Sequence, residues 1–193
     1  MRDKLLHPLV IVALTLFIAL MIFTGWPQSQ ESLARTAKDP NASLLFARMK
    51  AVGKLTDQSL LADVAKNADE KIIRMTATTQ LTDQAALTDV AKSTDDSYIR
   101  IEAIKKLTDQ AALADLAKNA DDQSIRRMAI RQLTDQTLLT DMIKNTKDMD
   151  RYERLLAIQQ LTDQAVLAEI AKNDGEYRLT AKKRLSELTG QTD

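Results

Sequence analysis

The tetrapeptide LTDQ occurs five times in this chain, and the spacing of its copies constrains the fold more than any other feature. The copies begin at positions 55, 81, 107, 133 and 161, so the intervals are 26, 26, 26 and 28 residues. A fixed period in this range is the signature of a repeat protein, in which each repeat is one supersecondary unit. A weaker copy, PQSQESLARTAK, begins at Pro27. We therefore define six units and a polar C-terminal cap: 27–54, 55–80, 81–106, 107–132, 133–160, 161–184 and 185–193.

Apolar residues within each unit recur with helical spacing. Every unit has a leucine six residues after its start, and a second apolar site follows three or four residues later. This is the spacing of one face of a helix. After a polar break, a second helix is predicted from the spacing of four between Ile125, Ala129 and Leu133. The matching alanine is present in all six units, at positions 51, 77, 103, 129, 157 and 181, which predicts close approach of helices there.

Polar residues at the predicted helix starts complete the pattern of a helical hairpin. Thr and Asp of LTDQ are favourable N-caps for the first helix, and Asp69, Asp95 and Asp121 lie where the second helix is expected to begin. One such hairpin cannot bury its apolar stripe alone, whereas stacked neighbours bury it together. The prediction is an all-α protein, an α-solenoid or superhelix of about six two-helix repeats.

The first segment, 1–26, carries the features of a membrane anchor. Arg2 and Lys4 precede an apolar run, 9–23, that contains no charge. A helix over residues 5–26 is expected to be about 33 Å long at ~1.5 Å per residue, close to the ~30 Å hydrocarbon thickness of a bilayer. The preceding positive charge predicts a single transmembrane helix with its N-terminus in the cytoplasm and the repeats on the extracytoplasmic, periplasmic side.

Cleavage of the same segment as a secretory signal peptide is the alternative. A cleavage site needs small residues at positions −3 and −1, and a site after Gly25 would place Phe23 at −3. We therefore favour the uncleaved signal anchor, in contact with the lipid bilayer through residues 5–26. Both interpretations place the repeats outside the cytoplasm.

Charge and residue usage exclude several classes of function. The chain has 27 basic and 27 acidic residues, no cysteine and one histidine, His7. Catalytic arrangements and zinc sites built from His or Cys are therefore not expected, nor is a basic surface for nucleic acid. The pairs Asp95–Asp96 and Asp121–Asp122 are better interpreted as helix caps than as an acid–base pair. We expect no enzyme activity, cofactor, metal, small-molecule substrate or nucleic-acid partner.

The segment DDQSIRRMAIRQL resembles the second helix of the short HEAT-like repeats of the phycobilisome-lyase type, and the resemblance covers about 27–184. The leucine-rich repeat variant is the runner-up. An arginine recurs in every unit, at positions 48, 74, 100, 126, 154 and 178. The resemblance implies a hydrogen-bond ladder between units, with the pairs Asp95–Arg100 and Asp121–Arg126, and a scaffold for binding. LTDQ is not part of the usual pattern of that family, and such repeats share architecture rather than activity.

Three further sets of equivalent positions, with one residue in each unit, are candidates for binding; we call such a set a column. Glutamine recurs in all six units, and we favour a hydrogen bond to the neighbouring unit's backbone over a role in binding a partner. Lysine closes each first helix, where it complements the helix dipole; a basic stripe is the alternative. Tyr98 and Tyr152 each precede a column arginine by two residues and are the candidate partner-binding residues, although packing over a turn would also explain them.

The function expected from these features is that of a non-enzymatic, membrane-tethered scaffold for protein–protein interaction. Its partner would be a membrane protein or a membrane-proximal complex that needs an assembly or stability factor. A secreted soluble repeat protein, released by signal cleavage and acting as a free binder or inhibitor, is the alternative. An enzyme of the lyase type is disfavoured because no catalytic constellation is present.

Overall fold

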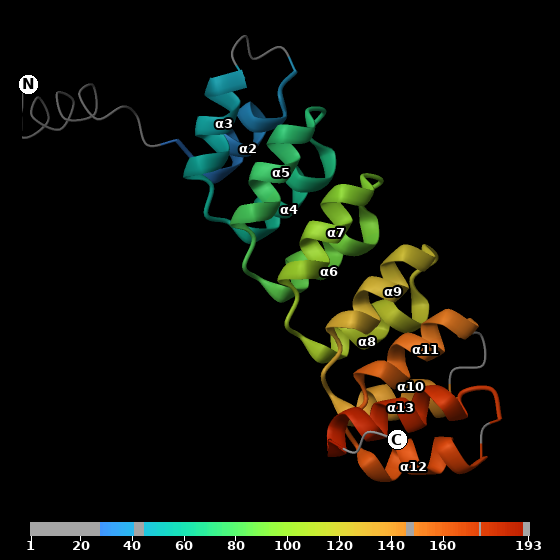
Figure 1. Ribbon diagram of the computed structural model, residues 1–193. Coiled ribbons are helices and arrows are strands. Elements are labelled where there is room, and N and C mark those ends of the chain that lie inside the picture. Colours follow the sequence, from blue (N-terminus) through green and yellow to red (C-terminus); the bar gives the residue numbers. More distant parts are fainter. Residues whose placement is uncertain (1–27, 41–44, 146–148, 174, 191–193) are drawn as a thin grey trace, which may run out of the picture.

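A computed structural model of the chain describes residues 28–40, 45–145, 149–173 and 175–190. In these ranges the protein has twelve helices and no strand, which confirms the prediction of an all-α chain (Figure 1). The helices that open the units are α2 (Gln30–Lys38), α4 (Gln58–Asn67), α6 (Gln84–Ser93), α8 (Gln110–Asn119), α10 (Gln136–Asn145) and α12 (Gln164–Asn173). Those that close them are α3 (Leu45–Lys54), α5 (Lys71–Gln80), α7 (Ser97–Lys106), α9 (Gln123–Gln132), α11 (Arg151–Gln160) and α13 (Arg178–Thr189).

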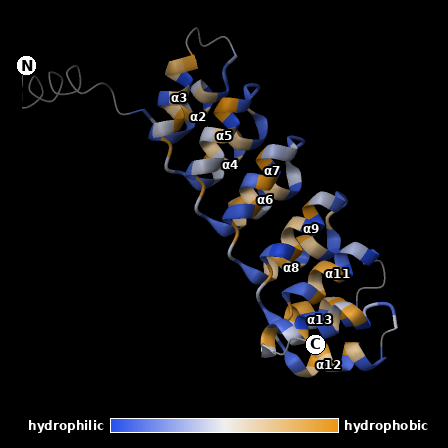
Figure 2. Cartoon of the chain, viewed as in Figure 1, coloured by the Kyte–Doolittle hydropathy of each residue, from blue (hydrophilic) through white to orange (hydrophobic). Residues whose placement is uncertain are grey.

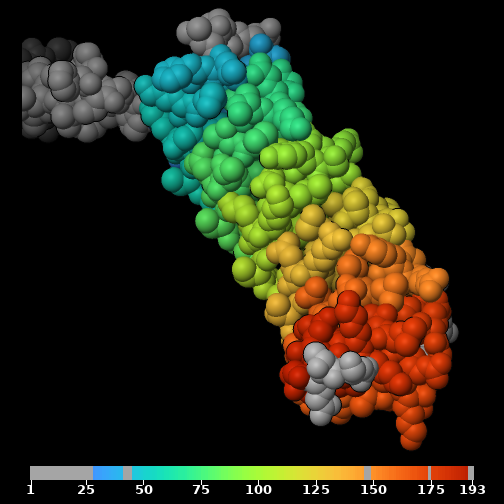
Figure 3. Space-filling model, viewed as in Figure 1, coloured from blue at the N-terminus to red at the C-terminus, as the bar shows by residue number. Residues whose placement is uncertain are grey.

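The helix pairs stack in sequence order. Within a unit the two helices pack against each other, and the second helices of successive units form one continuous row from α3 to α13. Figure 1 shows the resulting elongated array, and the space-filling view in Figure 3 shows neighbouring units in contact along it. Each unit therefore contacts mainly its neighbours, as expected for a stack of repeats.

LTDQ forms the turn between one unit and the next. Its leucine directly follows a second helix and is buried, with 0–2% exposure in all five copies. Its aspartate is the N-cap of the next first helix, as Asp57, Asp83 and Asp109 show by accepting hydrogen bonds from backbone N–H groups of the first turn. The predicted role of LTDQ as a turn and helix start is confirmed, with Asp rather than Thr as the capping residue.

The core is a single cluster of mainly aliphatic side chains that runs through all six units. The column leucines of the first helices are at most 2% exposed and the column alanines of the second helices at most 5% exposed. Figure 2 shows hydrophobic and hydrophilic residues alternating around the helices, as amphipathic helices require. The burial of every alanine in this column is consistent with the expected close approach of the helices there.

The second helices begin one residue later than the sequence suggested. Their N-caps are Glu70, Asp96, Asp122 and Asp150, and all but Glu70 accept a backbone N–H in the first turn. The expectation that Asp69, Asp95 and Asp121 would be the caps was wrong by one position. Because two consecutive acids occur in these turns, local sequence alone does not fix which of them starts the helix.

The membrane segment predicted for residues 1–26 lies outside the described residues. Among the described helices, none combines the length and apolar character needed to cross a membrane. At the other end, α13 continues beyond the sixth unit to Thr189, so part of the predicted C-terminal cap is helical.

Candidate functional site

The glutamine column joins each unit to the next. The side-chain carbonyl of Gln84 accepts hydrogen bonds from the backbone N–H groups of Thr108 at 2.7 Å and Asp109 at 3.0 Å. Gln30, Gln58, Gln110 and Gln136 do the same to the following LTDQ turn. The first helix of one unit therefore supplies the acceptor for backbone donors at the start of the next. In five of the six units this glutamine is therefore a structural contact to the next unit.

The lysine column forms a second set of contacts between units. Lys66 pairs with Asp89 at 2.5 Å and Lys92 pairs with Asp115 at 2.6 Å, each acid lying on the first helix of the following unit. The same register joins Lys38 to Asp63, Lys118 to Asp141 and Lys144 to Glu169. Five lysines of the column are therefore partnered, and they do not form an open basic stripe.

The arginine column links the second helices, but through a different acid from the one expected. Arg100 donates from Nη2 to Asp122 of the next unit at 2.9 Å, and from Nη1 to the Thr94 carbonyl of its own unit at 3.3 Å. Arg74 likewise reaches Asp96 at 2.7 Å. Asp95, the expected partner of Arg100, is exposed.

Arg126 also departs from the expected pairing. It donates to the backbone carbonyl of Asp121 at 2.9 Å, while its carboxylate partner is Glu153 of the next unit at 2.8 Å. Glu153 is 1% exposed. The arginine ladder between units exists, but its acids come from the following unit.

These contacts hold several carboxyl groups in the ionised state. The hydrogen bond from Lys66 is the main cause that lowers the pKa of Asp89, and that from Lys92 is the main cause for Asp115. For Asp96 the main cause that lowers the pKa is the hydrogen bond from Arg74. These three carboxyl groups therefore take part in the contacts between units in their ionised form.

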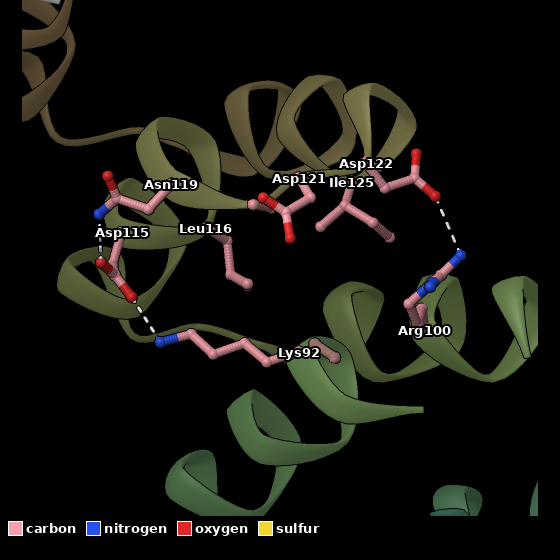
Figure 4. A pocket seen from close by; sticks show the side chains of 10 residues that line it. Lys92, Arg100, Asp115, Leu116, Asn119, Asp121, Asp122 and Ile125 are labelled. Atoms are coloured by element: carbon pink, nitrogen blue, oxygen red, sulfur yellow. Dashed lines mark hydrogen bonds and ion pairs between the residues drawn. The ribbon is translucent and has the colours of Figure 1, made fainter. Parts of the chain in front are cut away.

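A hollow lies between the third and fourth units. It has a volume of about 390 Å³ and a floor that includes Leu116 and Ile125. Figure 4 shows the Lys92–Asp115 and Arg100–Asp122 pairs on opposite sides of it. A similar hollow of about 400 Å³ lies between Lys144 and Arg154 in the fifth and sixth units. Because the hollow recurs in the same register, it is a feature of the stacking rather than a specialised pocket.

No group of three or more His, Cys, Asp or Glu side chains suited to a metal occurs in the described ranges. The acids around the hollow of Figure 4 are two ladder carboxylates, Asp115 and Asp122, and the exposed Asp121. The arrangement offers hydrogen-bonded ion pairs and aliphatic walls.

Tyr98 and Tyr152 lie on the outer side of the row of second helices. Tyr98 is 42% exposed and Tyr152 is 45% exposed. Each ring lies under a cation of the preceding unit, with Lys71 Nζ 4.5 Å from the Tyr98 ring centre and the Arg127 guanidinium 4.6 Å from that of Tyr152. Cation–π contact orients both rings while leaving a large part of each open to a partner.

Three further apolar side chains extend this surface and were not singled out from the sequence as binding residues. Phe46 and Ile72 occupy the position of Tyr98 in the first two units, and they are 75% and 41% exposed. Met49 lies one turn further along α3 and is also exposed. We name Phe46, Met49, Ile72, Tyr98 and Tyr152 together the second-helix face. The signal that could have found it is the column two residues before each arginine, which is aromatic or aliphatic in four of six units.

Comparison with known protein families, with curated proteins and with solved structures gives no match.

Proposed function

We propose that this protein is a non-enzymatic scaffold that binds another protein through the second-helix face. The observation that carries the proposal is the set of exposed apolar side chains on the second helices α3, α5, α7 and α11. Most other recurring positions of the chain form contacts within the stack. Aromatic residues that stand out from a polar surface are the usual anchors of protein interfaces. A row of them in register suits a partner that lies along the array.

The ordering of the tyrosines supports the same proposal. A side chain that is already held in one orientation loses less conformational entropy when a partner covers it. Lys71 and Arg127 hold the rings of Tyr98 and Tyr152 from the preceding units. The rigid stack thus presents two anchors at a fixed separation, roughly 20 Å for two helix spacings of ~10 Å.

We further propose that the scaffold is a HEAT-like α-solenoid tethered to the membrane by residues 5–26, with the repeats on the extracytoplasmic side. The charge asymmetry and apolar length of that segment support the tether. The first unit begins at residue 27, directly after the tether, so the repeats stay close to the membrane surface. The partner is then a membrane protein or a complex assembled beside the membrane, and the role that fits is an assembly or stability factor.

Release by signal peptidase is the second candidate, and the mass of the mature protein separates the two. Retention of residues 1–26 in the membrane fraction supports the tether. A mature chain shorter by about 25 residues, found in the soluble fraction, would replace the tethered scaffold with a free binder.

Site-specific photo-crosslinking in native membranes tests the binding face. A photoreactive residue at Tyr98 or Tyr152 is expected to give one discrete crosslinked product. The control places the same residue at Ala111, which is exposed on α8 and belongs to a first helix. Equal products from Ala111 and Tyr98, or no product from either tyrosine position, would contradict the proposed face.

A further inference from the structure

The second helices carry a strongly biased charge, although the whole chain is neutral. On α9 the charged residues are three arginines, and on α3 they are Arg48, Lys50 and Lys54. The five second helices from α3 to α11 contain two acids, Glu102 and Glu153. Glu102 is held by Lys105 at 2.7 Å, and Glu153 is buried against Arg126. Arg48 is buried and pairs with Asp69 and Glu70, so the exposed charged side chains of α3 are Lys50 and Lys54.

The acids that balance this charge are mostly engaged elsewhere. The first helices carry the acids that pair with the lysine column, and the turns carry those that pair with the arginine column. Asp96 and Asp122, at the edge of the second-helix face, accept both a backbone N–H of their own helix and an arginine of the preceding unit. Their charge is largely neutralised by these contacts.

Several cations beside the apolar side chains have no such partner. Among the described residues Lys50, Lys54 and Lys71 form no ion pair, and Lys71 lies directly over the Tyr98 ring. Arg131 contacts the Tyr152 hydroxyl at 3.4 Å and is otherwise open. Unpaired cations interleaved with exposed Phe46, Ile72 and Tyr98 therefore define the electrostatic character of the surface.

We infer that the second-helix face takes an acidic protein segment whose apolar residues dock on the row and whose carboxylates lie against these cations. The inference rests on the proposed function, because it specifies the chemistry of the partner at the same surface. Charge complementarity favours it: a basic partner would meet like charge at Lys50, Lys71 and Arg131, which raises the free energy of the complex. Carboxylates beside an apolar anchor gain attraction to the lysines without displacing any ladder contact.

The test uses full-length protein in discs of zwitterionic lipid and two synthetic amphipathic peptides. One peptide has leucine and phenylalanine anchors with glutamate at every other position, and its counterpart has lysine in place of glutamate. The acidic peptide is expected to bind at least about tenfold more tightly than the basic one, and added salt is expected to weaken it. Equal affinities, or preference for the basic peptide, would overturn the inference.

Matched charge reversals locate the binding. Lys71→Glu is expected to lower the affinity for the acidic peptide by about three- to tenfold, whereas Lys172→Glu is expected to leave this affinity unchanged. Lys172 is exposed on α12, away from the second helices. A glutamate at position 71 lies at the first residue of α5, where it suits the helix dipole, so folding should persist. An equal effect of the two reversals would mean general attraction to the protein rather than docking on this face.

Two further measurements distinguish an acidic protein partner from a lipid surface, and distinguish failure of this inference from failure of the proposed function. If phosphatidylserine vesicles bind in a way that depends on Lys71 and the acidic peptide does not bind, the ligand of this face is an anionic membrane and not an acidic protein segment. Native crosslinks from Tyr98 that survive Lys71→Glu would refute the acidic partner but leave the scaffold proposal intact. Loss of the Tyr98 crosslink in the same variant supports both.

Discussion

The glutamine of LTDQ acts on a unit other than its own. Gln110 receives the N–H groups of Thr134 and Asp135, which open the next unit and have no helical acceptor of their own. A single side-chain carbonyl thus satisfies two backbone donors at a turn that every unit must make. This accounts for a glutamine at this position in the five units that precede an LTDQ turn.

Replacing Gln110 with leucine should therefore destabilise the stack by about 1 kcal/mol, because two backbone donors lose their protein acceptor and recover only part of the energy from water. The change is measured as a shift in the midpoint of urea unfolding followed by circular dichroism. Gln164→Leu is the matched control, since Gln164 lies on the last first helix and accepts no bond from a following turn in the described residues. Equal midpoints for the two variants would show that the ladder adds nothing.

The alanine column should resist enlargement. Ala129 is 0% exposed within the core, so Ala129→Leu must displace neighbouring helices and is expected to cost about 1–3 kcal/mol or more. Ala111→Leu places the same side chain on an exposed helix position and should stay within about 0.5 kcal/mol of the parent. Thermal unfolding of the two variants compares them directly, and a stable Ala129→Leu protein would mean that the helices can separate there without loss.

At the scale of the element, the N-cap aspartates of the second helices serve two purposes. One oxygen of Asp122 accepts from Ser124 N at 2.8 Å, which caps α9. The other accepts from Arg100 at 2.9 Å, which joins α9 to α7. The start of a helix and its attachment to the preceding unit are thus fixed by one carboxylate.

The two purposes can be separated by substitution. Asp122→Asn keeps a good cap but removes the charge, and we expect a loss of a few tenths of a kcal/mol to about 1 kcal/mol. Asp122→Ala also removes the cap and should cost about 1 kcal/mol more. Urea unfolding of both variants gives the difference. If the asparagine variant loses as much stability as the alanine variant, the cap contributes little and the ion pair accounts for the whole effect.

Acidification should loosen the array at the contacts between units. The lysine and arginine partners lower the pKa of Asp89, Asp96 and Asp115 below that of an unfolded aspartate, about 3.9. A carboxyl group with a lowered folded pKa stabilises the protein fully above its unfolded pKa, and that stabilisation is lost as pH falls through the folded pKa. Urea midpoints should therefore be nearly constant from pH 7 to about pH 5 and fall below about pH 4. Midpoints that rise on acidification would contradict this assignment.

At the scale of the whole molecule, the lysine–acid contacts all run from one unit to the next, and the first unit lacks the acid that would receive such a contact. Each following first helix carries an acid at its sixth residue, which receives the lysine of the unit before it. In α2 the sixth residue is Arg35. Head-to-tail stacking of two copies would bring Lys172 against this arginine, so like charge opposes growth of the array into a fibre.

Reversing that charge should relieve the block. Arg35→Glu supplies the missing acid, and we expect it to increase end-to-end association in sedimentation velocity, whereas Arg35→Gln removes repulsion without adding attraction and should increase it less. The increase should diminish at high salt. Identical sedimentation of the parent and Arg35→Glu would show that other features of the ends prevent stacking.

Much of the array followed from the sequence. The period of 26 residues, the leucine and alanine columns and the acids at turns predicted helices, their pairing and their core, because these depend on neighbours within one hairpin. Tyr98 and Tyr152 were predicted as binding residues from their position two residues before an arginine, whereas the exposed Phe46 in the same register was not. The binding role of all three residues stays a prediction. The membrane segment lies outside the described residues and stays a prediction.

What the sequence by itself determined is the repeated unit: where each helix lies, which side is apolar, and that one unit needs another. What only the tertiary structure decided is which residues of different units meet. Arg100 was expected to meet Asp95 and instead meets Asp122, 22 residues away. The physical reason is that local periodicity sets the face of a helix, whereas the offset between stacked units sets which acid comes within hydrogen-bonding distance. The consecutive aspartates Asp95–Asp96 and Asp121–Asp122 look alike along the chain, and the stacking of the units distinguishes the two members of each pair.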